Sequence, residues 1–225
     1  MSDGAVLAID TAFGPIGVAL CSSAGEMITA EMLSDALGAQ AEKLPPLVEG
    51  MFAAAAFEPR RLGRIAVTVG PGAFTGVRVG LAFAKGLALA LKIPLLGFTT
   101  LQCLAAQARA VRAGAAVYVS IIDARRGEFY VQGFDGVLAS LFGPDVMTAD
   151  SVEARLREAA GPIALAGSGA AVIGERIHGQ RRDVDVVPNS SIDARLLVLT
   201  ARAADPALHL PVPCYLRAAD ARLPS

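Results

Sequence analysis

The sequence predicts an α/β protein in which mixed sheets are flanked by helices, with this pattern repeated in two lobes. Three observations predict this fold class. The chain has 225 residues, of which 54% are hydrophobic and 18% charged, enough for one large domain or two small lobes with substantial cores. In the first half, short apolar runs alternate with segments of helical periodicity. Ile9-Asp10-Thr11 and Ile122-Asp123-Ala124 each end one strand of an expected hairpin, as a duplication would produce.

The first half is predicted to follow the pattern β-β-β-α-β-α-β. Its first three strands form a meander because turn residues separate the apolar runs. In the helix that follows, Leu44, Leu47, Val48 and Met51 recur at three- and four-residue steps. The expected ranges are strands 5–10, 16–21 and 26–33, helix 39–57, strand 65–69, helix 74–91 and strand 94–98.

The second half begins in the same way but is less regular. A hairpin of strands 117–123 and 128–134 comes first. The remaining elements are helix 149–159, strand 163–166, a helix opened by Gly167-Ser168-Gly169, strand 184–187, and helix 193–204, with Ser190 and Ser191 as capping candidates. We expect an amino-terminal lobe at 1–112 and a smaller carboxy-terminal lobe at 113–225, whose last residues return to the first lobe.

Composition excludes several classes of function. Twenty Lys and Arg oppose 21 Asp and Glu, so no overall basic field exists to hold nucleic acid unaided. No segment approaches ~18 uncharged apolar residues and the amino terminus lacks the features of a secretory signal, so we expect a cytoplasmic chain without a membrane segment. Cys21, Cys103 and Cys214 are odd in number and scattered, which favours reduced core residues over disulfides or zinc.

The glycine-rich segment at 70–78 lies between an expected strand and an expected helix. Such a turn can present backbone N–H groups to phosphate. It is no Walker loop, because no lysine follows Gly76, and the glycine spacing does not fit a dinucleotide-binding fingerprint. The alternative is a tight turn that starts the helix.

The helix after this turn carries a flat face. Small side chains recur there at four-residue steps: Gly76, Gly80, Ala84 and Ala88. Larger apolar side chains form a second face: Phe83, Leu87 and Leu91. Because few polar residues remain, we expect this helix to be buried all round. A flat stripe admits a close neighbour, either from the same lobe or from another subunit, and both alternatives stay open.

Asp10 and Asp123 are the main candidates for chemistry. In two-lobed nucleotide-binding proteins, hairpin loops from both lobes hold phosphate, and these aspartates occupy matching positions. The alternative is that each accepts turn amides. The two histidines, His178 and His209, have no metal-pair spacing, and Ser168 lacks a nucleophile elbow.

Several motifs occur together in the order of a known family. They are Leu7-Ala8-Ile9-Asp10-Thr11, GPGAFTGVRVG at 70–80, IDARRGE at 122–128 and Tyr215-Leu216-Arg217. By these motifs the chain resembles the TsaB family, also called YeaZ. The resemblance implies an actin, hexokinase and Hsp70-like fold of two ribonuclease H-like lobes. Ala73 departs from the serine usual in the glycine-rich segment, and Gln40 from a common histidine.

The resemblance also implies a role. It indicates a non-catalytic subunit that dimerises with a TsaD-like homologue and supports docking of a TsaE-like ATPase, for threonylcarbamoylation of the adenosine next to the tRNA anticodon. tRNA would be met only through this complex, and self-pairing of the isolated chain is an open alternative. The catalytic homologue binds metal through His-x-x-x-His, whereas the matching helix here has Gln40, Lys43 and Leu44. We therefore expect no catalytic residue, metal or cofactor.

Two sets of site residues are expected. The interface set lies on the two long helices: Leu47, Met51, Phe74, Thr75, Gly76, Val79, Gly80, Phe83, Ala84 and Leu87. The vestigial nucleotide set lies in the turns: Asp10, Thr11, Asp123, Gly167 and Gly169. The alternative function is an independent ATPase or small-molecule kinase of the same fold that uses Asp10 and Asp123, although the amino-lobe loops offer few phosphate donors.

Overall fold

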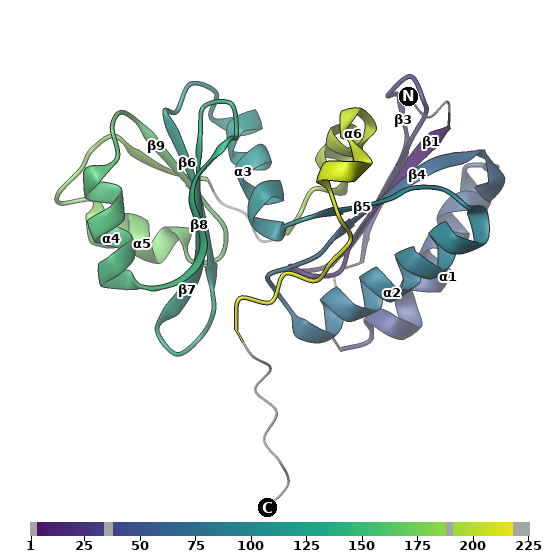
Figure 1. Ribbon diagram of the computed structural model, residues 1–225, viewed down its shortest axis with the longest axis horizontal. Helices are drawn as coiled ribbons and strands as arrows, with labels where there is room; N and C mark the ends of the chain where they lie inside the picture. The colour runs from purple at the N-terminus through teal and green to yellow at the C-terminus, as the bar shows by residue number, and fades with distance from the viewer. Residues whose placement is uncertain (1–3, 34–37, 188–190, 218–225) are drawn as a thin grey trace, which may run out of the picture.

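Two lobes lie side by side in the structure, a computed structural model that describes residues 4–33, 38–187 and 191–217 (Figure 1). Within these residues, each lobe holds a five-stranded sheet. The first sheet comprises β1 (Ala5–Asp10), β2 (Ile16–Cys21), β3 (Met27–Leu33), β4 (Leu62–Thr68) and β5 (Leu95–Phe98). The second comprises β6 (Val117–Asp123), β7 (Glu128–Asp135), β8 (Ser140–Thr148), β9 (Ile163–Ala166) and β10 (Val184–Val187).

The second sheet repeats the first. The strand orders are β3-β2-β1-β4-β5 and β8-β7-β6-β9-β10. In the first sheet, β1 pairs antiparallel with β2 and parallel with β4. In the second, β6 pairs antiparallel with β7 and parallel with β9. The expected fold class of mixed sheets in two lobes is therefore confirmed, and the ends of β1 and β6 occupy equivalent positions.

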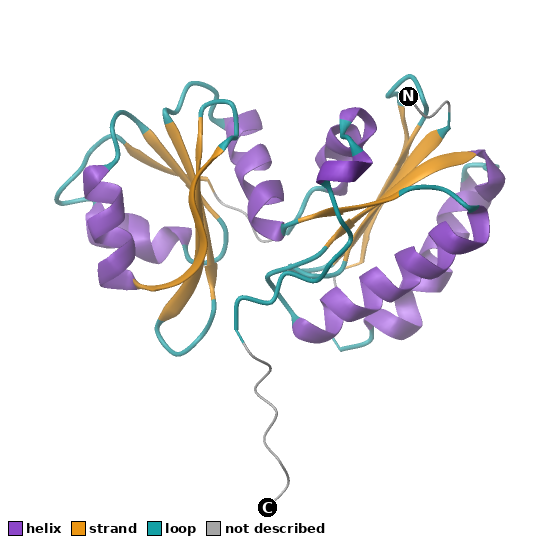
Figure 2. Ribbon diagram, viewed as in Figure 1, coloured by secondary structure: helices purple, strands orange, loops and turns teal. Residues whose placement is uncertain are grey.

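Helices cover both faces of each sheet (Figure 2). The helical elements are α1 (Gln40–Ala54), η1 (Pro59–Arg61), α2 (Phe74–Leu91), α3 (Thr100–Val111), α4 (Ala149–Glu158), α5 (Ala170–Ile177), α6 (Ala194–Ala203) and η2 (Pro206–Leu208). In the first lobe, α1 and α2 lie on one face of the sheet, and α6 packs on β1 and β2 from the other. In the second, α3 packs on β6 and β9, while α4 and α5 lie on the opposite face.

The chain crosses between the lobes twice. α3 precedes residue 112 but packs on the second sheet, and α6 follows residue 113 but packs on the first. Arg64 on β4 fixes α6 there, because its Nη1 donates to the carbonyl oxygens of Ala201, at 3.0 Å, and Ala204, at 2.8 Å. The first sheet is thus built from strands before residue 112 and the second from strands after it, whereas α3 and α6 each pack on the sheet of the other half.

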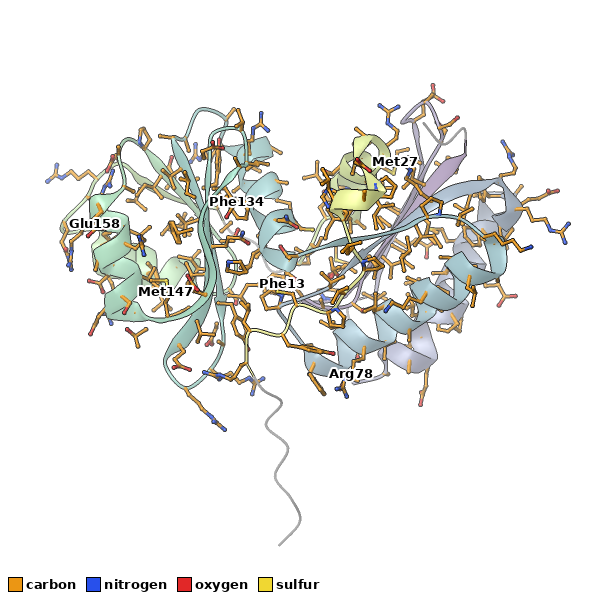
Figure 3. All side chains as sticks on the ribbon, in the orientation of Figure 1. Phe13, Met27, Arg78, Phe134, Met147 and Glu158 are labelled. Atoms are coloured by element: carbon orange, nitrogen blue, oxygen red, sulfur yellow. The ribbon has the colours of Figure 1, made fainter. Side chains whose placement is uncertain are left out.

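The core is continuous between the lobes. One hydrophobic cluster joins residues of the first sheet, α3, α6 and the second sheet, among them Ala8, Leu104, Tyr118 and Val198. Phe13 belongs to this cluster and lies where the lobes meet (Figure 3). Separate clusters lie beneath α1 with α2 and beneath α4 with α5.

Two local expectations need correction. α2 is not buried all round, because the side chain of Leu89 is 81% exposed. Among the described residues α2 is also the one helix long and apolar enough to cross a membrane, yet its buried side chains belong to the first lobe's core. α6 is capped by Asp193, whose side chain accepts from the Arg195 N–H, rather than by Ser191. Ser190 lies outside the described residues.

Candidate functional site

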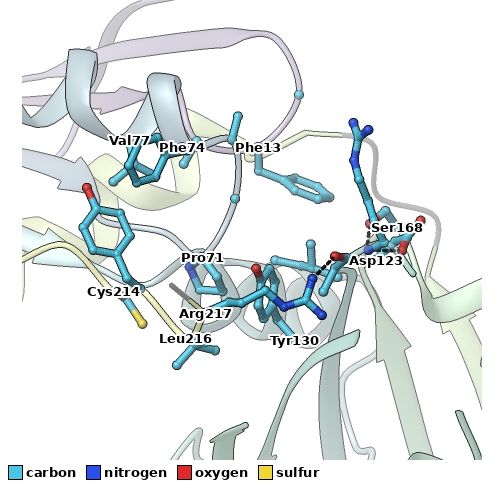
Figure 4. Close-up of a pocket in the computed structure, with 18 residues that line it drawn as sticks. Phe13, Pro71, Phe74, Val77, Asp123, Tyr130, Ser168, Cys214, Leu216 and Arg217 are labelled. Carbon is cyan, nitrogen blue, oxygen red and sulfur yellow. Dashed lines mark hydrogen bonds between the residues drawn. The ribbon is translucent and has the colours of Figure 1, made fainter. Parts of the chain in front are cut away.

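A cleft of about 670 Å³ lies between the lobes (Figure 4). Four turns and one extended segment line it. They are the β1–β2 turn, the glycine-rich turn before α2, the β6–β7 turn, the β9–α5 turn at Ser168, and residues 214–217. Segments far apart in the sequence therefore meet at one place.

Asp10 is buried beneath the cleft rather than exposed in it. Its Oδ1 accepts hydrogen bonds from the Thr68 hydroxyl at 2.5 Å and the Ala12 N–H at 3.1 Å. Its Oδ2 is buried without a hydrogen-bond partner. Burial, which disfavours the carboxylate, raises the pKa of Asp10 from 3.8 to about 7, and the hydrogen bonds only partly oppose this. Asp10 thus carries a large desolvation penalty at neutral pH.

Thr11 is also buried, and it joins the β1–β2 turn to α2. Its hydroxyl donates a 2.7 Å hydrogen bond to the carbonyl oxygen of Gly76. Neither Asp10 nor Thr11 is among the residues that line the cleft. In this conformation both residues shape the first lobe's turn from below, so a ligand in the cleft would not touch them directly.

Asp123 lies in the open, at the equivalent position of the second lobe. Its Oδ1 accepts from the Arg125 N–H at 2.7 Å, which is the turn-amide arrangement considered above. Its own backbone N–H donates to the Ser168 hydroxyl at 3.0 Å. Asp123 and Ser168 therefore bring the β6–β7 and β9–α5 turns together along one wall of the cleft.

Gly167 and Gly169 support this wall from within. Gly167 has φ +105°, a conformation that L side chains rarely adopt. The N–H of Gly169 donates to Ile121 O at 3.0 Å, and a Cβ at Gly169 would lie 2.6 Å from a ring carbon of Phe129. Both glycines are buried, so of this turn Ser168 alone lines the cleft.

One wall of the cleft was not predicted from the sequence. Cys214, Tyr215, Leu216 and Arg217 line it, and Arg217 Nη1 donates to the carbonyl oxygen of Ala124 at 3.0 Å. The family motif Tyr215-Leu216-Arg217 is the sequence signal for this wall. No group of three or more His, Cys, Asp or Glu side chains within the described residues is placed to hold a metal ion.

The ten expected interface residues divide into a buried and a surface group. Met51, Gly76, Gly80 and Ala84 are buried inside the first lobe. The others are half-buried or exposed: Leu47, Phe74, Thr75, Val79, Phe83 and Leu87.

The flat stripe of α2 faces the chain's own β1–β2 turn. A Cβ on Gly76 would collide with the carbonyl oxygen of Thr11, and a Cβ on Gly80 with the Thr11 hydroxyl. The sequence left open whether the stripe packs within its own lobe or against another subunit; these contacts show that it packs within the lobe. Another subunit cannot reach it without displacing Thr11.

An apolar groove lies beside the stripe, between α1 and α2. Its volume is about 550 Å³, and its apolar lining includes Phe52, Phe57, Phe83 and Leu87. Ala53 lines the groove and is exposed, so a larger side chain there would project from the surface.

Two ribonuclease H-like lobes with a cleft at their equivalent strand ends define a protein of the actin and hexokinase-like class. A family model described as TsaD, tRNA N6-adenosine threonylcarbamoyltransferase, matches residues 34–159. The tRNA threonylcarbamoyladenosine biosynthesis protein TsaB of Bacillus subtilis is 31% identical over 96% of this chain and 95% of its own. The Escherichia coli protein of the same name is 34% identical over 56% of this chain and 52% of its own. YeaZ from Pseudomonas aeruginosa superposes with a TM-score of 0.77 at 28% identity, covering 95% of this chain and all of that one. The chain belongs to the TsaB (YeaZ) family of tRNA threonylcarbamoyladenosine biosynthesis.

Proposed function

We propose that this chain is a non-catalytic subunit that pairs with a TsaD-like catalytic homologue through the outer face of α1 and α2. The complex would add threonylcarbamoyl to the adenosine next to the tRNA anticodon, in the cytoplasm. A TsaE-like ATPase would dock on the pair, and tRNA would be met only through the complex. The observation that carries the proposal is the uncovered apolar groove between α1 and α2.

The groove has the character of a helix-binding surface. Phe83 and Leu87 from α2 and Phe52 from α1 line it, and Glu49 and Glu58 add acidic groups to its lining. Apolar grooves between helices bind the apolar face of a partner helix, and charged residues at the rim select its orientation. A partner helix with apolar residues at its centre and basic residues at its edges fits this surface.

The likeness to TsaD suggests where the partner helix comes from. Residues 34–159, which match the TsaD family model, include both α1 and α2. A TsaD-like homologue is therefore expected to present an equivalent pair of helices. Two related surfaces can meet about a pseudo-twofold axis, as identical surfaces meet in a symmetric dimer. The same logic lets two copies of this chain pair when the homologue is absent.

The lack of catalysis is inferred from side-chain chemistry. Gln40 and Leu44 stand where the catalytic homologue needs two histidines, and both are buried in α1. Asp10, the first-lobe candidate for phosphate chemistry, is buried beneath the cleft. The cleft itself favours a second candidate, the independent ATPase or small-molecule kinase. Titration calorimetry with ATP and Mg²⁺ on the isolated chain separates the two, because micromolar binding with turnover would favour the kinase.

Co-purification tests the proposal. A tagged form of the chain, expressed in its own organism, should bring down a TsaD-like homologue in near-stoichiometric amount, together with a small ATPase when nucleotide is present. Capture of neither protein, from cells shown to express both, would contradict the proposed role.

A further inference from the structure

The last part of the described chain crosses the cleft. We call residues 209–217, which follow η2, the C-terminal strap. In Figure 1 it is the yellow segment that runs from below α6, past the first lobe, toward the second. The Gly97 N–H donates to His209 O at 2.9 Å, and the Cys214 N–H donates to Val69 O at 2.7 Å. Backbone hydrogen bonds therefore hold the strap along the first lobe.

The sequence of the first lobe accommodates the strap closely. A Cβ at Gly97 would lie 2.9 Å from the Cα of Pro211, so glycine is needed on β5 for the strap to approach. The ring of His209 stacks on Phe98, with ring centroids 4.3 Å apart.

Tyr215 fixes the strap to the beginning of α2. Its ring centroid lies 5.4 Å from that of Phe74. The guanidinium of Arg78 lies 3.7 Å from the Phe74 ring centroid, and its Nε donates to the Tyr215 hydroxyl at 3.2 Å. Two aromatic rings and one cation thus anchor the strap just before it leaves the first lobe.

Arg217 then reaches the second lobe. Besides its hydrogen bond to the Ala124 carbonyl oxygen, it forms an ion pair with Glu128 at the start of β7. Its side chain is 24% exposed and that of Glu128 39%, so the pair is partly shielded from solvent. Figure 4 shows Arg217 inside the cleft, directed at the β6–β7 turn.

We propose that the C-terminal strap is a latch that ties the two lobes together across the cleft and controls how far the cleft opens. One end is held by the first lobe through Val69, Phe74 and Arg78. The other end, Arg217, holds the second lobe through Ala124 and Glu128. When Arg217 releases, the β6–β7 turn loses its tie to the strap, so the cleft wall that this turn forms with Ser168 can move away from the first lobe. A ligand or partner that binds this wall would displace Arg217, and so would shift the population toward the open state.

Cys214 is a native reporter of the latch. Cys214 belongs to the strap; its thiol is half-buried, and burial raises its pKa. Cys21 and Cys103 are buried in the core, so a thiol reagent should reach Cys214 first in the folded chain. Replacing Arg217 with alanine should speed labelling of Cys214 about tenfold, a factor that corresponds to about 1.4 kcal/mol of strap opening.

Exchanging the charges of Arg217 and Glu128 separates loss of this ion pair from a general destabilisation of the chain. Arg217→Glu should speed labelling because it places two carboxylates together, and adding Glu128→Arg should return the rate toward that of the wild type. Arg195→Ala is the matched control, since it removes an arginine whose ion pair with Asp193 lies outside the strap. An unchanged labelling rate in folded Arg217→Ala and Arg217→Glu would overturn the proposal.

A distance measurement tests whether the lobes themselves move. Spin labels at Gly86→Cys on α2 and Ala154→Cys on α4, in a Cys214→Ser background, report the separation of the lobes by double electron–electron resonance. A broader distance distribution in the Arg217→Ala form is expected. Faster labelling of Cys214 together with an unchanged distribution would mean that the strap frays without coupling the lobes, and would also overturn the proposal.

Discussion

The hydroxyl of Thr11 donates a hydrogen bond of 2.7 Å to the carbonyl oxygen of Gly76, and so joins the β1–β2 turn to the first turn of α2. This contact requires the two backbones to approach closely, which the absence of side chains at Gly76 and Gly80 permits. The small residues of α2 are therefore part of the first lobe's fold, and the docking surface that we propose lies beside them.

Substitution of Gly76 tests this assignment. Gly76→Ala should destabilise the chain by about 2 kcal/mol, because the new methyl group would meet the backbone oxygen of Thr11. Gly86→Ala, on the same helix, should instead stabilise it by up to about 1 kcal/mol, since nothing lies within 4 Å of the added Cβ. Urea denaturation measures both. Equal stability of the two variants would show that the stripe does not pack on Thr11.

Asp10 should make stability depend on pH. Its folded-state pKa, about 7, lies above the ordinary aspartate pKa of 3.8, so between these pH values the native chain holds a proton that the unfolded chain releases. The free energy of unfolding is therefore highest, as far as Asp10 is concerned, below pH 3.8, where the carboxyl is protonated in both states. This stability is lost as the pH rises through about 7. Relative to the wild type, Asp10→Asn should gain up to about 4 kcal/mol between pH 4 and pH 8, at about 1.4 kcal/mol per pKa unit.

Denaturation curves across this pH range test the Asp10 prediction. The control is Asp123→Asn, which changes the equivalent but exposed aspartate and should follow the wild type. Parallel stability curves for Asp10→Asn and the wild type would mean that the carboxyl is not desolvated.

Arg64 should be essential for holding α6 on the first lobe. Arg64→Met removes the donor to the carbonyl oxygens of Ala201 and Ala204 at the end of this helix. We expect a loss of about 3 kcal/mol, because these are charge-assisted hydrogen bonds in a buried place. Arg112→Met should cost less than about 1 kcal/mol, since its ion pair with Asp185 is exposed. Similar losses of stability in Arg64→Met and Arg112→Met would contradict the role of Arg64 in holding α6 on the first lobe.

Much of the fold could be predicted from the sequence because the apolar runs have clear ends. The ranges expected for β1, β2, α2, β9 and β10 agree with the structure residue for residue. These elements are bounded by glycine, proline or charged turn residues, which act locally.

One α-helix and one strand, α3 and β8, were not predicted from the sequence. α3 begins after Thr99, which forms a capping box with Gln102, a signature that the sequence carries openly. β8 could not be predicted from its hydrophobic pattern. Gly143-Pro144 interrupts it, and its register with β7 shifts near Gly133, so it shows no regular alternation.

The candidate site was harder to predict than the fold. Periodicity located the small residues on one side of α2, but it could not show that Thr11 lies against them. Matching motifs placed Asp10 and Asp123 at equivalent strand ends, yet one is buried and the other exposed. The contacts of Arg217 could not be predicted from its neighbours in the sequence, because the packing of both lobes brings Ala124 and Glu128 to it.

The proposed division of labour predicts an inactive isolated chain. Given tRNA, ATP with Mg²⁺ and threonylcarbamoyl-adenylate, the purified chain should form no modified adenosine, because Gln40 and Leu44 replace the histidines of the catalytic homologue. Mass spectrometry of digested tRNA measures this, and addition of a TsaD-like homologue serves as the positive control. Modified adenosine formed without that homologue would show that this chain is itself a transferase.

The affinity of the Ala53→Arg variant for the purified TsaD-like homologue tests the central claim most directly. Ala53 is exposed and lines the α1–α2 groove. The variant should therefore fold without strain, while its arginine side chain blocks a partner helix. We predict that calorimetry finds at least a roughly tenfold weaker Kd, about 1.4 kcal/mol, while the unfolding transition stays cooperative. Ala154→Arg, on the exposed face of α4, should bind like the wild type. A folded Ala53→Arg variant that binds the homologue with unchanged affinity would contradict docking through this groove.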